Sequence, residues 1–246
     1  METNNWRIWN SDSSVELRTY KRATGELPEM ESAKQLVDLV RDVYIPGMRI
    51  LDVGCAAGHY YRSLATIDRD IEYLGIDATV AYVEFANDYF KNRKAKFLIG
   101  DIFDLSDELG VFDIVFCCNL ILHLPDFRVP IENLLKVTKK YCFIRTLIGE
   151  KTHLSKFLYS DNFDENNNPT NFVYQNTYSF GLLKGFIDSL GDFNVELVDD
   201  EFNADNINRE FMDFEKKQSA VTRVIGNYQI SGSKIFEWKW LKVSPK

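Results

Sequence analysis

The fold of this chain is decided by one stretch, Ile50-Leu51-Asp52-Val53-Gly54-Cys55-Ala56-Ala57-Gly58. A short apolar run leads into a turn of small residues, and a helical pattern begins at Tyr60. An apolar run of this length is typical of a strand that is buried on both faces of a parallel sheet. Small residues let the backbone approach a ligand, and the start of the following helix offers free N–H groups. The stretch therefore predicts a ligand site at the carboxyl end of a buried strand.

The alternation of strand and helix continues on both sides of this stretch. Apolar residues at helical spacing predict a helix from Glu31 to the stop signal Pro46-Gly47. After the stretch we expect helices at 60–67, 80–90 and 129–138, and strands at 73–77, 95–99, 112–118 and 141–146. Strands that alternate with helices favour right-handed βαβ crossovers and a parallel sheet.

Residues 147–180 break this rhythm, because they contain a polar tract at 160–170 that is too long for an ordinary connection. We expect an insertion there, on the substrate side of the sheet. A helix at 180–190, a strand at 194–198 and an amphipathic stretch with basic residues at 210–218 follow. The last strand, at 235–243, alternates apolar and polar residues, which predicts an antiparallel edge strand.

Together these elements predict a single α/β domain over residues 1–246. We expect a Rossmann-like, doubly wound sheet of seven strands. It should be mostly parallel, with an antiparallel last strand and helices on both faces. A polar N-terminal cap, residues 1–45, and the insertion at 147–180 are expected to close over the substrate.

Charge, cysteine spacing and the lengths of apolar runs limit the kinds of partner and the cellular compartment that we expect. The 246 residues carry a formal net charge of −8 and no long run of lysine and arginine, which disfavours nucleic acid and favours a small-molecule substrate. The four cysteines form no C-x-x-C pair, which favours buried thiols over a metal site. No apolar run approaches the ~20 residues that span a bilayer, and no basic-then-apolar signal region is seen. We expect a cytoplasmic protein without a membrane span, whose edge strand and exposed aromatic residues would support a homodimer.

The spacing of the glycines distinguishes two classes of nucleotide-binding turn. Nicotinamide-dependent oxidoreductases on a related sheet use G-x-G-x-x-G, whereas Ala56 stands at the second glycine position here. The stretch Leu51–Gly58 resembles the LDVGCGxG motif of the class I methyltransferases that use S-adenosylmethionine (SAM). Three further segments resemble later motifs of that family, in the expected order within residues 48–146: Leu74-Gly75-Ile76-Asp77, Gly100-Asp101-Ile102-Phe103, and the strand and loop Phe112–Asp126.

The resemblance implies SAM as the cofactor, bound beyond the carboxyl ends of the first, second and fourth strands. Asp77 would accept hydrogen bonds from the ribose hydroxyls, or simply cap the next helix, and Asp101 would meet the adenine amine or cap a turn. Arg22 is expected to bind the methionine carboxylate or an anionic substrate, with a solvated surface charge as the plain alternative. The other cofactor-binding residues that we expect are Asp52, Gly54, Cys55, Ala56, Gly58, Ala78, Ile102, Phe103, Asn119 and Leu120.

Candidate catalytic and substrate residues follow the fourth and fifth strands. His123 and His153 are candidates for a general base, and a packing or positioning role is the alternative for His123. Arg145 ends an otherwise apolar run, which suggests a role towards an anionic substrate. In the insertion, we expect acceptor contacts from Tyr174, Asn176 and Tyr178.

The sequence leaves the methyl acceptor open. The Asn/Asp-Pro-Pro-Tyr type of motif that often marks nitrogen methylation is absent after the fourth strand, where the chain has Asn119-Leu120-Ile121-Leu122. We therefore expect an oxygen acceptor, and the layout resembles bacterial methyltransferases that modify sugars or other precursors of surface polysaccharides. The alternatives are nitrogen or carbon methylation of another small metabolite, and a non-catalytic SAM-binding regulator.

Overall fold

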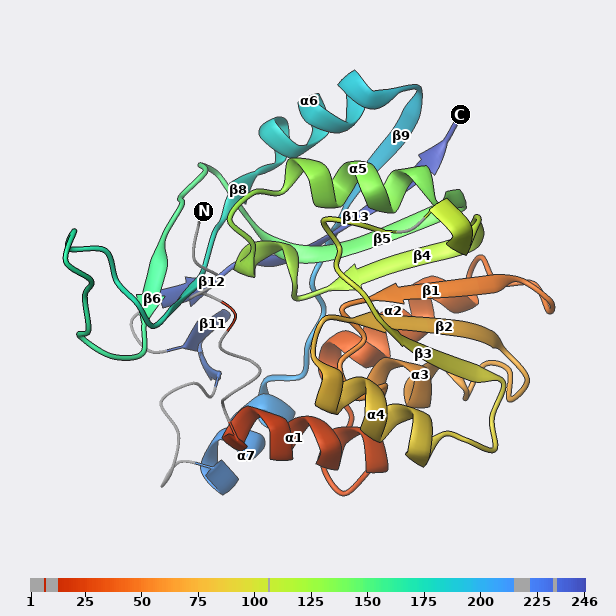
Figure 1. The fold of residues 1–246 in the computed structure, drawn as a ribbon, viewed down its shortest axis with the longest axis horizontal. Coiled ribbons are helices and arrows are strands. Elements are labelled where there is room, and N and C mark those ends of the chain that lie inside the picture. The colour runs from red at the N-terminus through yellow and green to blue at the C-terminus, as the bar shows by residue number, and fades with distance from the viewer. Residues whose placement is uncertain (1–6, 8–12, 106, 215–221, 232–233) are drawn as a thin grey trace.

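The computed structural model describes residue 7 and residues 13–105, 107–214, 222–231 and 234–246. Its centre is a twisted sheet with strand order β3-β2-β1-β4-β5-β13-β9, to which the short β8 adds by pairing with β5 (Figure 1). β1 to β5 run parallel, and β13 runs antiparallel to both of its neighbours. The strands are β1 (Arg49–Val53), β2 (Glu72–Asp77), β3 (Ala95–Ile99), β4 (Phe112–Cys118), β5 (Thr138–Gly149), β8 (Tyr178–Ser179), β9 (Phe193–Asp199) and β13 (Trp238–Pro245).

Helices cover both faces of this sheet and enclose two apolar clusters (Figure 1). One face packs against α5 (Arg128–Lys136) and α6 (Phe180–Leu190). The other packs against α2 (Glu31–Arg41), α3 (His59–Leu64) and α4 (Val80–Tyr89). The prediction of a doubly wound α/β fold, mostly parallel and with an antiparallel last strand, is confirmed.

The strand that opens the decisive stretch is buried on both sides, as its apolar run predicts. Leu51 and Val53 belong to the cluster under α5 and α6, whereas Ile50 belongs to the cluster under α2, α3 and α4. This follows from the two-residue period of a strand, which sends successive side chains to opposite faces. The reversal of strand order between β1 and β4 places the switch point of the sheet directly after this strand.

The last strand differs from its prediction in one respect. The chain pairs β13 between β5 and β9, so the edge of the sheet is formed by β9 and not by the last strand. Leu241 and Val243 lie in one apolar cluster and Trp240 lies in the other, so both faces of β13 are covered. Lys239 and Lys242 stand among these apolar residues, one on each face, and pair with Asp199 and Glu196 of β9. The lysines in this strand therefore mark ion pairs to the neighbouring strand and do not mark a solvent-exposed face.

Several small elements lie beyond the carboxyl ends of the strands (Figure 1). The N-terminal cap contains a helix, α1 (Ser13–Thr24), whose Tyr20 ring stacks on Phe85 of α4 with centroids 4.2 Å apart. The expected insertion begins within β5 and forms a hairpin, β6 (Lys156–Leu158) and β7 (Phe172–Tyr174). A further helix and a small sheet were not predicted: α7 (Ala204–Phe214), β10 (Arg223–Ile225), β11 (Tyr228–Ser231) and β12 (Lys234–Phe236).

The rest of the chain adds three observations. The amphipathic stretch expected at 210–218 overlaps the end of α7 at residues 210–214, and residues 215–221 lie outside the described residues.

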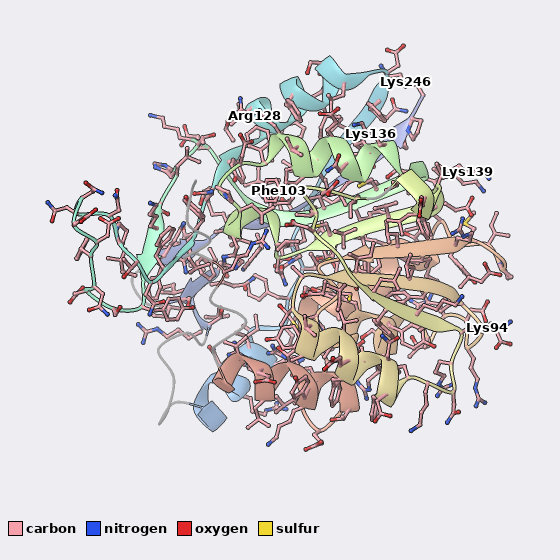
Figure 2. All side chains as sticks on the ribbon, in the orientation of Figure 1. Lys94, Phe103, Arg128, Lys136, Lys139 and Lys246 are labelled. Atoms are coloured by element: carbon pink, nitrogen blue, oxygen red, sulfur yellow. The ribbon has the colours of Figure 1, made fainter. Side chains whose placement is uncertain are left out.

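Figure 2 shows Lys94, Lys139 and Lys246 at the end of the molecule opposite the cap elements. Among the described helices, none has the length and apolar character needed to cross a bilayer.

Candidate functional site

A cavity of about 290 Å³ lies at the carboxyl ends of β1, β2 and β4, under α1. The turns that follow four successive strands meet there, as expected at the switch point of an open α/β sheet. The cavity is lined by these residues of the predicted set: Gly54, Ala56, Asp77, Ala78, Asp101, Ile102, Asn119, Leu120, His123 and Arg22. Residues that the sequence reasoning missed also line it, among them Arg18, Thr19, Met30, His59, Tyr60 and Tyr82.

The turn after β1 brings bare backbone to the cavity. Gly54 has φ 87°, in the left-handed region where glycine has no steric penalty. A Cβ atom on Gly54 would lie 2.9 Å from Cδ2 of Leu120, so the wall has no room for a side chain there. Ala56 has φ 47° and therefore bears the steric cost that a glycine at this position would avoid. The turn is thus shaped by backbone conformation and not by side-chain chemistry.

Asp77 ends β2 and ties this turn to the next helix. Its Oδ2 accepts a hydrogen bond from the Ala56 amide (2.8 Å), and its Oδ1 accepts one from the Thr79 amide (2.8 Å) at the start of α4. Burial raises the pKa of Asp77, and the two amide hydrogen bonds oppose that rise. An ionised carboxylate has about four acceptor positions, so Asp77 keeps capacity for hydroxyl donors in the cavity. The helix-cap and ligand-binding readings of Asp77 are therefore compatible.

The turn after β3 supplies an acidic group next to an apolar wall. The Asp101 carboxylate accepts hydrogen bonds from Arg7 Nη2 (2.6 Å) and from the Phe103 amide (3.1 Å). Ile76 and Ile102 line the cavity beside it. This part of the wall therefore combines two apolar side chains with the Asp101 carboxylate, one oxygen of which is hydrogen-bonded to Arg7.

Two of the three histidines reach the cavity. His123 Nδ1 lies 2.7 Å from the Tyr174 carbonyl oxygen, and burial lowers the pKa of His123 to about 4. Because a carbonyl only accepts, Nδ1 carries the proton and Nε2 is the basic nitrogen of the neutral ring. His59 follows the last glycine of the motif, and burial, helped by the charge of Arg22, lowers its pKa to about 3. Both rings are neutral at pH 7. His59 directly follows Gly58, the last glycine of the motif, and this position in the sequence could have identified it as a cavity residue.

His153, the third histidine, lies elsewhere. Its side chain is exposed, and its backbone forms a bridge with Thr177. It does not line this cavity, and its action as a base stays a prediction. The predicted fifth strand ends at residue 146, whereas β5 in the structure continues to Gly149. His153 therefore lies closer to the end of the strand than predicted, but outside the cavity.

Four predicted cofactor residues stand behind the cavity wall: Asp52, Cys55, Gly58 and Phe103. The Asp52 carboxylate is fully buried within β1 and accepts a hydrogen bond from the Tyr73 hydroxyl (2.5 Å), and burial raises its pKa well above the usual range. The Cys55 thiol packs against Gly75: a Cβ atom added to Gly75 would lie only 2.8 Å from the Cys55 sulfur. Asp52, Cys55 and Gly58 are buried at the end of β1 and in the turn that follows it, whereas Phe103 is half-buried in the turn after β3. Their contact with a cofactor stays a prediction.

Arg145 is buried, and its hydrogen bonds to protein groups leave it no catalytic freedom. Its guanidinium donates to both carboxylate oxygens of Asp200 (2.7 and 2.9 Å) and to Oδ1 of Asn119 (2.5 Å). It also stacks over Trp238, with 4.2 Å from Cζ to the ring centroid. Bidentate pairing of this kind fixes a guanidinium in place. Arg145 therefore anchors Asn119, and its predicted role towards an anionic substrate stays a prediction.

Arg145 and Asn119 belong to the wall of a second cavity of about 280 Å³. This second cavity shares Arg18, Arg22, Met30 and Asn119 with the first. The two cavities are thus neighbours along α1 and the loop after β4.

The predicted acceptor residues Asn176 and Tyr178 line neither cavity. Both are buried, and the Asn176 amide nitrogen donates to the Leu124 carbonyl (2.9 Å) and to the Tyr178 hydroxyl (3.1 Å). Tyr174 contributes its carbonyl oxygen to His123. These residues hold the loop after β4 in place, and their contact with a substrate stays a prediction.

Comparisons with known proteins agree with this geometry. A methyltransferase domain family matches residues 45–219. The chain is 32% identical over 99 residues to a wheat phosphoethanolamine N-methyltransferase, covering 39% of this chain and 19% of that protein. It is 28% identical over 138 residues to an O-methyltransferase of Aspergillus nomiae, covering 54% of this chain and 56% of that protein.

The chain therefore spans about a fifth and about half of the length of these two curated relatives. A solved structure of magnesium protoporphyrin IX methyltransferase from Synechocystis, with bound S-adenosylhomocysteine (SAH), has the same fold. It superposes with a TM-score of 0.61 at 14% identity, covering 98% of this chain and 97% of that one. Because the family match extends over more than half of the sequence and includes every motif-bearing strand, the chain belongs to the methyltransferase domain family.

Proposed function

We propose that this chain is a SAM-dependent methyltransferase that acts on a small polar acceptor. The observation that carries the proposal is the convergence of four motif segments on one cavity. The turns after β1, β2, β3 and β4 are separated in sequence by up to 65 residues, counted from Gly54 to Asn119, yet all four line its wall. Ligand sites of open α/β sheets form at this place because the carboxyl ends of the strands meet there.

The residues present fit SAM. Asp77 offers acceptor positions for ribose hydroxyls, and the turn at Gly54 lets a ligand approach the backbone closely. The apolar wall beside Asp101 suits the adenine ring, and the Arg22 guanidinium suits the methionine carboxylate. When bound, SAM supplies a methyl group activated by its sulfonium.

The contribution of the chain itself is mainly to position the reacting groups. Holding an acceptor in line with an activated methyl group removes a large entropic part of the barrier. His123 and His59 are neutral cavity residues, yet with pKa values of about 4 and about 3 they are weak bases. A general base is most effective when its pKa lies near the working pH, so we assign His123 a positioning role for the acceptor.

We propose an oxygen of a sugar or of a phosphorylated precursor of surface polysaccharide as the acceptor. The sequence resemblance supports this choice, together with the absence of a nitrogen-methylation motif after β4. The curated relatives include both O- and N-methyltransferases by name, so nitrogen methylation of another small metabolite is the alternative. The cytoplasmic setting, the single-domain organisation and a homodimer stay predictions.

Calorimetric titration with SAM, SAH and NADH tests the proposed cofactor. We expect micromolar binding of SAM and SAH and no heat of binding with NADH. Binding of NADH alone, or of none of the three, would contradict the proposal. Turnover is then measured as SAH release in the presence of sugar and phosphorylated acceptors, and SAM binding without any release would support a regulatory protein.

A further inference from the structure

The second cavity differs in charge from the chain as a whole. Its wall holds more cations than acids, although the chain carries a formal net charge of −8. The cavity lies among α1, α2 and α7 and is also lined by Arg145 of β5. The cationic residues of its wall are Arg18, Arg22, Lys34, Arg145 and Arg209, and the acidic residues are Glu29, Glu31 and Asp200.

Two of these cations are neutralised by neighbours in the same wall. Arg145 pairs with Asp200 through two hydrogen bonds, as described above. Lys34 Nζ pairs with Glu31 at 2.5 Å. Arg22 has other contacts within the protein. What remains of the ionisable wall is Arg18 of α1 and Arg209 of α7, with the carboxylate of Glu29.

The two remaining arginines come from different helices that line the same cavity. Arg18 and Arg22 are four residues apart on α1, and like charges at this spacing destabilise a helix. Arg209 comes from α7, which lies beside α1 (Figure 1) and lines the same cavity. Within the part of the chain that the structure describes, Arg18 and Arg209 form no ion pair or side-chain hydrogen bond. Such a cluster is stabilised when an anion is shared between the guanidinium groups.

We propose that the second cavity binds an oxyanion of the methyl acceptor, a phosphate or a carboxylate, through Arg18 and Arg209. This inference rests on the proposed function. The two cavities share Met30 and Asn119, so an acceptor anchored on these arginines reaches the first cavity along a common wall. Bound SAM carries a sulfonium and an ammonium against one carboxylate, so its net positive charge adds to the attraction of an anion.

The test uses anion titrations of the full chain saturated with SAH, at constant ionic strength because screening weakens such contacts. Inorganic phosphate and acetate are the two probes, and binding is followed by calorimetry. We expect saturable binding of at least one probe. Phosphate binding alone indicates a phosphorylated acceptor, and acetate binding alone indicates a carboxylate acceptor, and either outcome supports the proposal.

Matched variants locate the site. Arg209→Gln and Arg18→Gln each remove one guanidinium, and we expect about tenfold or greater weakening of anion binding. Arg69→Gln changes the same charge at an exposed position before β2, at the end of the sheet away from both cavities, and should leave anion binding unchanged. Arg209 lines only the second cavity, so Arg209→Gln should keep its SAH affinity within about twofold.

Two outcomes would overturn the inference. One is the absence of saturable binding by either anion while SAH still binds. The other is wild-type anion affinity in both Arg209→Gln and Arg18→Gln, each shown to be folded by its thermal melting curve. Failure of SAH itself to bind contradicts the proposed function instead, and the same titration series reveals it before any anion is added.

Discussion

The first cavity and the second cavity are neighbours, but their walls come from different sources. The first combines the turns that directly follow β1, β2, β3 and β4, where Asp77 is bonded to two amides, with side chains of α1. The second is built from side chains of α1, α2, α7 and β13 that are scattered from Arg18 to Trp238. A site for a common cofactor can be held by local turns, whereas a site for a particular substrate depends on long-range contacts.

The two walls are also stabilised by different forces. In the first, hydrogen bonds from backbone amides meet a carboxylate. In the second, a buried ion pair between Arg145 and Asp200 holds β5 to the segment after β9, and Gln229 adds a hydrogen bond to Asp200 (3.0 Å). This difference can be tested by variants on each side of the shared wall.

The largest effect is expected for Arg145→Ala. Removing the cation leaves Asp200 buried without its charge partner, which costs about 3–5 kcal/mol in the free energy of unfolding. Urea denaturation measures the loss. The double variant Arg145→Met/Asp200→Leu is the control, because it removes both charges and should recover most of the stability. A loss below about 1 kcal/mol for Arg145→Ala would contradict the anchoring role and make a catalytic role worth testing again.

The next effect is expected for Asp77→Ala, which should weaken SAH binding about 100-fold. Hydrogen bonds to a charged acceptor contribute about 1.5–3 kcal/mol, and each 1.4 kcal/mol corresponds to a factor of ten in the dissociation constant. Calorimetry with SAH gives the measurement. Asp52→Asn is the matched control, since Asp52 is buried behind the wall and should keep its SAH affinity within a few-fold. Equal losses in the two variants would show that the cofactor contacts are not those of the first cavity.

The two cavity histidines should make the folded state less stable as the pH is lowered from about 6.5 to about 4. The pKa of His123 is lowered to about 4 and that of His59 to about 3 by burial, so the unfolded chain takes up these protons before the folded chain does. Unfolding is therefore favoured as pH falls through this window, and the contribution is fully present above the ordinary histidine pKa. Melting temperatures across this range measure the slope. His123→Gln should flatten it, and an unchanged slope would contradict burial of a neutral His123.

The smallest effect is expected for Ala56→Gly. At φ 47° an alanine costs roughly 1–2 kcal/mol, which glycine avoids, while the greater freedom of glycine in the unfolded chain returns part of that gain. We expect a net stabilisation of about 1 kcal/mol or less, seen as a higher melting temperature, with SAH affinity unchanged. A lower melting temperature would show that the turn does not need this conformation in solution.

Much of the sheet could be predicted, because strands and helices from β1 to α5 have clear periods and glycine-marked ends. The last strand was placed at the edge because its lysines look like an exposed face. The structure shows instead that Lys239 and Lys242 pair with β9. A one-dimensional pattern cannot distinguish a lysine in water from a lysine beside a neighbouring carboxylate.

The candidate site divides in the same way. Gly54, Asp77, Asp101 and Asn119 were found because each follows a strand, and all four line the first cavity. Arg145 also ends a sequence pattern that suggests function, yet Asp200, 55 residues away, binds it. Asn176 and Tyr178 are likewise held by partners in the loop after β4, far from them in sequence.

By itself, the sequence indicated the family, the succession of parallel strands along the chain and the turns that face the first cavity. These features depend on local spacing and on backbone conformations that short motifs encode. Only the tertiary structure decided which charges are neutralised and which stay open, because that depends on partners brought together by folding. Arg145 stands alone in an apolar run, whereas Arg209 lies among acidic residues such as Asp205 and Glu210. One is buried against Asp200 and the other lines a cavity without an ion-pair partner among the described residues, and this contrast defines the second cavity.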